Sequence, residues 1–438
     1  MTPLLWGAIV LVFLLALLAL GTPIAFALGF VSIVILMLAE GSGSLSILGE
    51  TFFGGLASFG LVSIPMFILM GAAVASSPAG KDLYEALDRW LNRVPGGLVL
   101  SNLGACSIFA ALSGSSPATC AAIGKMGIPE MTKRGYPNEI AAGSIAAGGT
   151  LGILIPPSIT MIVYGIATET SIGRLFLAGL VPGAMLTALF MIWTVYACKR
   201  QGIGLSEITR AYSMRERLSA LPRVLPFLAI IVAILYVLYG GIATPSEAAG
   251  VGAIICLVFV AVIYRLWKPS LYTGLFRDTL KESVMIMMII GASELFSFTL
   301  SSLFITQSIA EWIAGLEVNR WVLMAIINVF LLFAGFFLPP VAVILMTAPI
   351  LLPIITQAGF DPYWFAVVFT INMEIGLITP PVGLNLYVIN GIAPKITLSE
   401  ILRGAMPYVG CMVVGIILLC LMPGIATWLP DLLMGPGL

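Results

Sequence analysis

Apolar stretches of about 20 residues, the length that crosses the hydrocarbon core of a bilayer as a helix, follow one another along nearly the whole chain. The 438 residues leave room for roughly a dozen such elements. Only 9% of the residues are charged, against about 25% in an ordinary soluble domain. The polar remainder is too short and too scattered for a separate soluble domain. We therefore predict one membrane domain, residues 1–438, with an all-α polytopic fold.

The charged and reactive side chains exclude several classes of function. Lys plus Arg and Asp plus Glu balance at 20 each, so nothing indicates nucleic-acid binding. The chain has no histidine, which removes the commonest general base and metal ligand. Ser115 and Ser116 have no nearby His, Lys or Asp to activate them. The six cysteines lie in apolar stretches without a CxxC pair, and we interpret them as packed thiols. We predict no catalytic residue and no enzyme.

Basic residues set the predicted topology. Two basic segments, Lys199–Arg223 and Arg265–Lys281, flank an apolar hairpin over residues 224–264 that turns at its middle. Both segments therefore lie on one side, and the positive-inside rule makes that side the cytoplasm. When the spans are counted outward from this hairpin, only Arg174 and Arg320 of the basic residues fall outside.

Two further segments of the sequence complete the predicted topology. Lys81–Arg93 alternates charged and apolar residues and is typical of an amphipathic helix on the inner membrane surface. The run from Met1 to Leu20 carries no charge, so it lacks the basic region of a signal peptide. We predict that this run is a retained first span.

An internal repeat is the most informative feature of the sequence. The string Gly152-Ile153-Leu154-Ile155-Pro156-Pro157 recurs as Gly376-Leu377-Ile378-Thr379-Pro380-Pro381, at an offset of 224 residues (376 minus 152). Pro129 and Gly135 recur as Pro353 and Gly359 at the same offset. We predict two repeats, residues 57–198 and 283–425, joined by the 224–264 hairpin as part of a scaffold.

The two copies are predicted to be inverted. The first Pro-to-Gly loop carries Lys133 and Arg134 and lies inside, whereas its counterpart carries Asp361 and lies outside by the span count. Inverted repeats are a known plan of secondary transporters, with the substrate and ion sites at the repeat interface. Two inverted copies provide two nearly equivalent states, one open to each side of the membrane.

Each half also contains two breaks in its apolar segments. In the first half, Ser113–Pro117 separates two arms, near 98–112 and 118–126, which favours a re-entrant hairpin, and Gly148–Pro157 forms the second break. The second half breaks at Leu338–Pro340 and at Gly376–Gly383. Non-helical backbone persists in hydrocarbon only around a protected polar cavity. Half-helix N-termini favour anions there, and freed carbonyls favour cations. The breaks therefore indicate a carboxylate substrate carried with a small hard cation.

At these breaks the sequence resembles the large, DctM-like membrane subunit of tripartite ATP-independent periplasmic (TRAP) transporters. The match covers essentially the whole chain. The strings that carry the resemblance are Ser113 to Thr119, Ala146 to Ser158, Ser171 to Phe176, Gly335 to Pro340 and Asn372 to Leu386.

The resemblance implies a sodium-coupled elevator transporter of organic acids in the bacterial inner membrane, with a transport domain that slides against a scaffold. It also implies two protein partners: a separate four-helix small membrane subunit and a periplasmic binding protein that delivers the substrate. Dicarboxylates, including C4-dicarboxylates, sugar acids and keto acids all remain open as substrates.

The breaks and the resemblance together give the predicted substrate and ion site. Its residues are Ser113, Gly114, Ser115, Ser116, Pro117, Thr119, Gly149, Thr150, Gly152, Pro156, Pro157, Gly335, Leu338, Pro339, Pro340, Asn372, Glu374, Gly376, Thr379, Pro380, Pro381, Val382, Gly383 and Asn385. Sodium is expected near Ser115, Ser116, Gly149, Thr150, Gly376 and Thr379. No cofactor beyond this coupling ion is predicted.

Two alternatives stay open. The chain could be a stand-alone carboxylate symporter coupled to sodium or protons, or a passive channel. Proton coupling needs a titratable group in the membrane, and the candidates are Glu294 and Glu374. Glu374 could relay protons, balance a cation or make a polar contact in the bundle. Hydroxyl and carbonyl oxygens are abundant at the breaks and suit sodium, because hard cations prefer oxygen ligands.

Overall fold

The computed structural model describes residues 2–203, 212–314 and 319–435, and these form helices joined by short loops, without a strand. Among the described residues, seven helices are long and apolar enough to cross a membrane, and a bent helix pair brings the number to eight. The prediction of an all-α polytopic membrane protein is confirmed.

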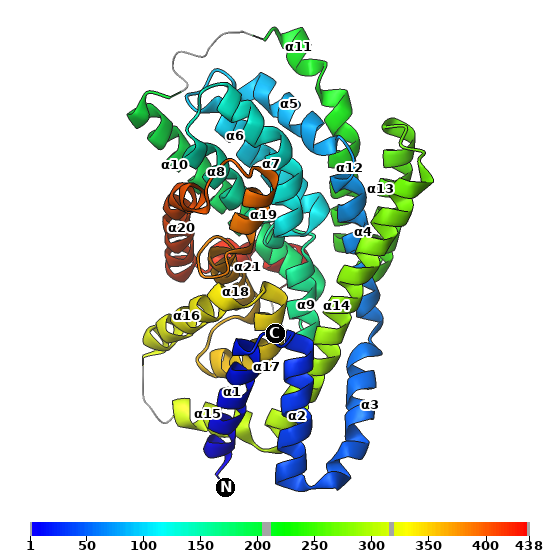
Figure 1. Ribbon diagram of the computed structural model, residues 1–438, viewed down its shortest axis with the longest axis vertical. Coiled ribbons are helices and arrows are strands. Elements are labelled where there is room, and N and C mark those ends of the chain that lie inside the picture. Colours follow the sequence, from blue (N-terminus) through cyan, green and yellow to red (C-terminus); the bar gives the residue numbers. More distant parts are fainter. Residues whose placement is uncertain (1, 204–211, 315–318, 436–438) are drawn as a thin grey trace.

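One group of helices forms an elongated wall. It contains α1 (Pro3–Ala19), α2 (Ile24–Glu40), α3 (Leu45–Leu56), α4 (Ser63–Ala75), α12 (Leu221–Tyr239), α13 (Pro245–Ile263) and α14 (Pro269–Ser302). The long α14 packs against α2, α3 and α4, and α13 packs against α4 (Figure 1). Helices α3 and α4 are bent by 55° at their break. The predicted hairpin over 224–264 is present as α12 and α13.

The second group follows the order predicted for the first repeat. It runs α5 (Ala79–Leu91), α6 (Gly97–Ser113), α7 (Ser116–Lys133), α8 (Asn138–Thr150), α9 (Ile159–Ala167) and α10 (Ile172–Gln201), with a 3-10 turn, η3 (Leu151–Ile153), between α8 and α9. The short α11 (Met214–Leu218) precedes α12. The helix α5 covers the segment predicted to be amphipathic, with Leu83 and Tyr84 on its buried face.

The third group has the same order. It runs α15 (Ile305–Ala314), α16 (Arg320–Phe337), α17 (Pro340–Gln357), α18 (Pro362–Leu377), α19 (Leu384–Ile392) and α20 (Leu398–Leu421), and α21 (Gly424–Met434) follows. Helix α17 begins 224 residues after α7 (340 against 116), and α18 begins 224 residues after α8 (362 against 138). This correspondence supports the predicted repeat, whose boundaries and inversion remain predictions.

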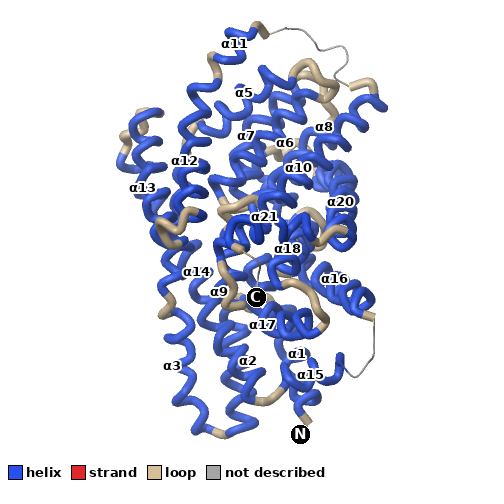
Figure 2. The backbone as a smooth tube through the Cα atoms, turned by 180° about the vertical axis from the view of Figure 1, so that it is seen from behind, coloured by secondary structure: helices blue, strands red, loops and turns tan. Residues whose placement is uncertain are grey.

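The second and third groups interlock. Helix α9 of the first half packs against α17 of the second, and α19 of the second half packs against α7 of the first. Helices α6, α8 and α18 are buried along nearly all of their length. Figure 2 shows these helices in the body of the molecule, with α1, α2 and α3 towards one end of the long axis and α11 at the other.

The first hairpin differs from the prediction in its second arm. The first arm, α6, ends at Ser113 as expected, but α7 runs to Lys133 rather than stopping near residue 126. Pro129 does not end the helix. Thr132 Oγ1 donates to the carbonyls of Ile128 and Pro129, at 3.0 and 3.1 Å, which gives polar partners to backbone groups around the proline.

Candidate functional site

The tip of the first hairpin is a tight turn stabilised by hydroxyl groups. Gly114 adopts a left-handed conformation (φ 58°) that favours glycine, and α7 begins at Ser116 with Pro117 in its first turn. Ser113 Oγ lies 2.8 Å from Thr119 Oγ1, and Thr119 Oγ1 donates to the carbonyl of Ser115 at 2.9 Å. The tip is therefore a fixed loop at the N-terminus of α7.

The break between α8 and α9 is hydrogen-bonded to this tip and packs against it. Ser158 Oγ accepts from Met161 N at 3.3 Å and donates to the Ile153 carbonyl at 2.5 Å, so it spans the non-helical stretch and caps α9. Ile159 N donates to the carbonyl of Gly114 at 3.4 Å. A Cβ on Gly152 would lie 2.6 Å from the Ser115 carbonyl oxygen, so the close approach requires glycine there.

The second half repeats this arrangement at its own break. Val382 N donates to the Phe336 carbonyl at 3.1 Å, which joins the α18–α19 break to the second hairpin. Gly376 lies directly against the backbone of Gly335, with no room for a side chain. Gly383 is left-handed (φ 51°) and precedes α19. The Pro156–Pro157 and Pro380–Pro381 peptide bonds are both cis.

A cavity of about 500 Å³ lies between the two hairpin tips and the wall of helices formed by α2 and α14. Its lining includes the first residues of five helices: α7, α9, α17 and α19, which carry the hairpin tips and breaks, and α2 of the wall. A helix N-terminus presents unbonded N–H groups and the positive end of the helix dipole. The four at the tips and breaks favour an anion. The lining residues with polar side chains are Thr22, Ser115, Ser116, Thr160 and Glu282.

Six of the predicted site residues line this cavity. They are Gly114, Ser115, Ser116, Pro117, Pro339 and Pro340, so the structure brings the two hairpin tips together.

The other predicted residues do not line this cavity: Gly149, Thr150 and Thr379 are buried in the protein, whereas Pro380, Pro381 and Val382 are exposed. Thr150 Oγ1 donates to the Ala147 carbonyl at 2.7 Å, and Thr379 Oγ1 donates to the Ile375 carbonyl at 2.6 Å. A hydroxyl that donates in this way still has lone pairs to offer a cation. Gly149 packs against the thiol of Cys120. Pro156 lines a separate apolar cavity between α6, α10 and α12.

Asn372 and Glu374, two predicted site residues that lie on α18, are buried inside the protein. Asn372 Nδ2 donates to Asn328 Oδ1 at 2.5 Å and to the Val368 carbonyl at 2.9 Å. Glu374 is fully buried, and neither of its carboxylate oxygens has a hydrogen-bond partner within the described part of the chain. The structure leaves the three roles considered for Glu374 open.

Glu282 is an ionisable lining residue that the sequence analysis missed. It directly follows Lys281, the last residue of a segment that was considered only for membrane topology. A helical period would have revealed it, because Glu282, Met285, Ile286 and Ile289 share one face of α14 and all line the cavity.

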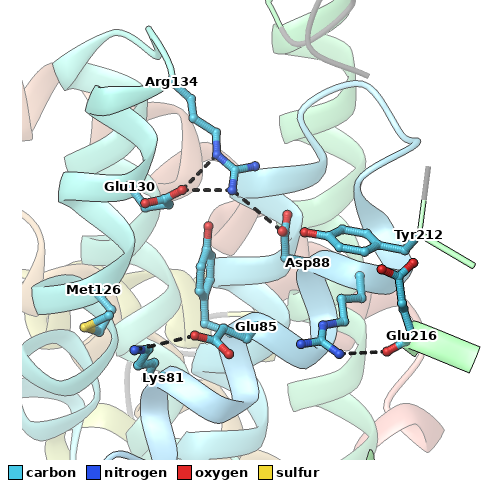
Figure 3. A pocket seen from close by; sticks show the side chains of 10 residues that line it. Lys81, Glu85, Asp88, Met126, Glu130, Arg134, Tyr212 and Glu216 are labelled. Atoms are coloured by element: carbon cyan, nitrogen blue, oxygen red, sulfur yellow. Dashed lines mark hydrogen bonds and ion pairs between the residues drawn. The ribbon is translucent and has the colours of Figure 1, made fainter. Parts of the chain in front are cut away.

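A second cavity, of about 540 Å³, lies at the base of the first hairpin, between α5, α7 and residues 212–216 (Figure 3). Arg134 pairs with Glu130 at 2.8 Å and with Asp88 at 3.8 Å. Burial raises the pKa of the Asp88 carboxyl above its usual range, and Arg134 opposes this shift. None of the predicted site residues lines this cavity, and its charged side chains largely pair with one another.

Comparisons with known proteins bear directly on this arrangement. The family model of the tripartite ATP-independent periplasmic transporter, DctM component, matches residues 11–425. The C4-dicarboxylate TRAP transporter large permease protein DctM of Pseudomonas aeruginosa is 40% identical over 371 residues, which cover 85% of this chain and 86% of that protein. The protein of the same name from Vibrio cholerae is 37% identical over 452 residues, covering 98% of each.

The fold also resembles a solved transporter structure. The crystal structure of the Alcanivorax borkumensis YdaH transporter aligns with a TM-score of 0.66 at 17% identity, covering 90% of this chain and 91% of that chain. At this identity the likeness concerns the fold alone.

Proposed function

Because this chain belongs to the family of the DctM component of tripartite ATP-independent periplasmic transporters, we propose that it carries an organic acid across the membrane together with sodium, by an elevator movement. The chain is a multi-pass protein of the inner membrane and a transporter permease, not an enzyme. The two relatives described above are named as C4-dicarboxylate permeases, which makes a C4-dicarboxylate the first substrate to test.

The convergence of four helix N-termini on one cavity carries this proposal. Anions are stabilised at helix N-termini by unbonded N–H groups and by the dipole. The N-termini belong to α7 and α9 of the first half and to α17 and α19 of the second. A dicarboxylate bound between the tips would therefore contact both halves at once, which is the position expected for a substrate between repeats.

Sodium is the coupling ion that the surrounding oxygens favour. The hydroxyls of Ser113, Thr119, Thr150 and Thr379 lie at or just behind the hairpin tips and breaks, together with backbone carbonyls. Hard cations of this size are bound by such oxygens. Coupling by protons would need a titratable carboxylate, and of the two candidates Glu294 and Glu374 it is Glu374 that is fully buried on the helix that ends at the second break.

An elevator movement is supported by how the cavity is built. One side of the cavity comes from the interlocked helices of the two halves, and the other comes from α2 and α14. Sliding of the interlocked helices past α2 and α14 would carry the tips, and a substrate held between them, across the membrane. We propose two partners, a small membrane subunit and a periplasmic binding protein. With this chain they make three components, which fits the tripartite transporters after which the family is named.

Uptake into proteoliposomes tests this function. A radiolabelled C4-dicarboxylate is supplied with or without the small subunit, the binding protein and an inward sodium gradient. Accumulation that needs all three is the expected result. Accumulation without the binding protein would identify a stand-alone symporter, and uptake that only equilibrates would identify a channel. Accumulation driven by a proton gradient without sodium would reject sodium coupling.

A further inference from the structure

Glu282 is the only ionisable residue, among those described, whose side chain lines the cavity between the hairpin tips. It belongs to α14, on the side of the cavity opposite the tips. No hydrogen bond or ion pair involves its carboxylate within the described residues. Lys281 does not neutralise it across the cavity, because consecutive residues of a helix point in different directions and Lys281 is not a lining residue.

The location of Glu282 creates an electrostatic conflict. The four helix N-termini at the tips favour a carboxylate substrate, whereas Glu282 places a negative charge on the opposite wall of the same cavity. Like charges that share one cavity repel each other. An anion between the tips is therefore held less tightly when the tips face Glu282 than when they do not.

We propose that Glu282 is a release residue: its carboxylate weakens the binding of an anionic substrate in the state in which the hairpin tips face α14 at this position. This proposal rests on the function proposed above. Because α14 belongs to the wall and not to the interlocked helices, the repulsion acts in one state and is absent once the tips move away. A group that interacts differently with the substrate in two states shifts the affinity between those states.

The direction of release follows from the basic segments. Glu282 directly follows Lys281, the last basic residue of the second basic segment, which the positive-inside rule assigns to the cytoplasmic side. The cavity also includes Thr22 and Pro23, from the loop between α1 and α2. The same span count places this loop inside. The repulsion would therefore act at the cytoplasmic end of the transport movement and favour substrate release there.

Inhibition of uptake by internal substrate measures this effect. The binding protein is supplied only outside the vesicles, so the measured uptake comes from transporters whose periplasmic face is outward, and internal substrate samples their cytoplasmic face. We expect Glu282→Gln to lower the internal dicarboxylate concentration that halves uptake by on the order of tenfold, the effect of one unit charge about 12 Å from the substrate charge at an effective dielectric of about 20. Glu282→Asp should behave like the wild type.

Two further variants test whether the effect comes from negative charge in the cavity. Asp278→Asn removes a carboxylate from the same helix, α14, at an exposed position that does not line the cavity, and should leave internal inhibition unchanged. Thr22→Asp, made in the Glu282→Gln protein, restores a negative charge to the cavity. The internal dicarboxylate concentration that halves uptake should then rise back towards the wild-type value.

Two outcomes would overturn the proposal. Unchanged internal inhibition in Glu282→Gln would show that the carboxylate does not act on the substrate. Weaker internal inhibition in that variant would show that Glu282 binds the substrate or the coupling ion instead of repelling an anion. A wild-type protein that accumulates no dicarboxylate under any gradient would reject the proposed function itself, which is a separate result.

Discussion

The side-chain nitrogen of Asn385 lies 2.8 Å from Ser116 Oγ, although 269 residues separate the two in the chain. Asn385 is in the first turn of α19, after the second break, and Ser116 begins α7 at the first hairpin tip. The same Asn385 amide donates to the Ala146 carbonyl of α8 at 3.1 Å. One buried side chain thus joins the broken helix of one half to the hairpin and broken helix of the other, which fits their movement as a single body.

Asn385→Ala should therefore reduce both stability and transport. Removing one partner leaves the buried groups around Ser116 and Ala146 unsatisfied, which costs about 1–3 kcal/mol. Thermal unfolding in detergent measures the loss. In a double-mutant cycle, adding Ser116→Ala should cost less than in the wild type, because the shared hydrogen bond is already absent. Additive losses would show that the two side chains do not depend on each other.

A matched control for this cycle is Ser144→Ala. Ser144 is also fully buried in the interlocked helices, but its hydroxyl bonds only to the Ala141 carbonyl within α8, at 3.2 Å. Its replacement should lower stability by less than the Asn385 variant does and should leave uptake close to the wild-type rate.

Gly152→Ala and Gly376→Ala should each impair folding or transport. A methyl group on Gly152 would overlap the Ser115 carbonyl, and one on Gly376 would overlap the Gly335 backbone, so the hairpin and the break would have to separate. Overpacking of this kind costs about 1–3 kcal/mol or more. Unfolding temperature and uptake rate report the two effects. Gly410→Ala on α20 meets open space and should be neutral or slightly stabilising; equal behaviour of all three variants would contradict the packing argument.

The breaks could be predicted from the sequence because their chemistry is local. Each break contains two consecutive prolines, Pro156-Pro157 and Pro380-Pro381, and two adjacent residues without an N–H group interrupt the helical hydrogen bonds more severely than a single proline such as Pro129 does. The repeat offset of 224 then predicted which helices correspond, and α7 and α17 begin at that offset. The extent of α7 could not be predicted from local chemistry, because Pro129 lies inside the helix without ending it.

The contacts across the site depend on tertiary structure and leave no local pattern. Nothing near Asn385 in the sequence indicates that its partner is Ser116. Glu282 was missed because the segment that ends at Lys281 was used only to set the topology, and the residues after it were not compared along one face of α14. Predicting such residues would require knowing which helix faces each hairpin tip.

Ser116→Ala combined with Thr379→Ala should weaken the sodium dependence of uptake. Each change removes a hydroxyl oxygen at one of the two predicted ion sites, and loss of a cation ligand lowers affinity. We expect the sodium concentration for half-maximal uptake to rise by roughly tenfold, equivalent to about 1.4 kcal/mol. Thr379→Ser keeps the oxygen and should stay near the wild type. Thr356→Ala removes an exposed hydroxyl of α17 and serves as the control. Unchanged sodium activation in the double variant would reject this site assignment.

Arg134→Ala should destabilise the protein more at pH 8 than at pH 5. Asp88 lies on α5, outside the predicted spans, and its side chain is only 7% exposed. Burial raises the pKa of its carboxyl, and Arg134 is the main group that counteracts this rise. Without Arg134 the folded-state pKa rises further. A carboxyl whose pKa is higher in the folded than in the unfolded protein destabilises the fold only where it must ionise, so the penalty grows with pH above the unfolded value of about 3.9.

The loss in unfolding temperature caused by Arg134→Ala should therefore shrink as the pH falls from 8 towards 5, because the buried Asp88 can then keep its proton. Adding Asp88→Asn to the Arg134→Ala protein removes the titrating group and should abolish the pH dependence of the difference. Arg403→Ala is the matched control, since Arg403 pairs with Glu139 at 3.8 Å with side chains 73% and 45% exposed, and exposed pairs contribute about 0–1 kcal/mol. A loss that grows towards pH 5 would mean that Arg134 acts through Glu130 and α7 rather than through the buried Asp88.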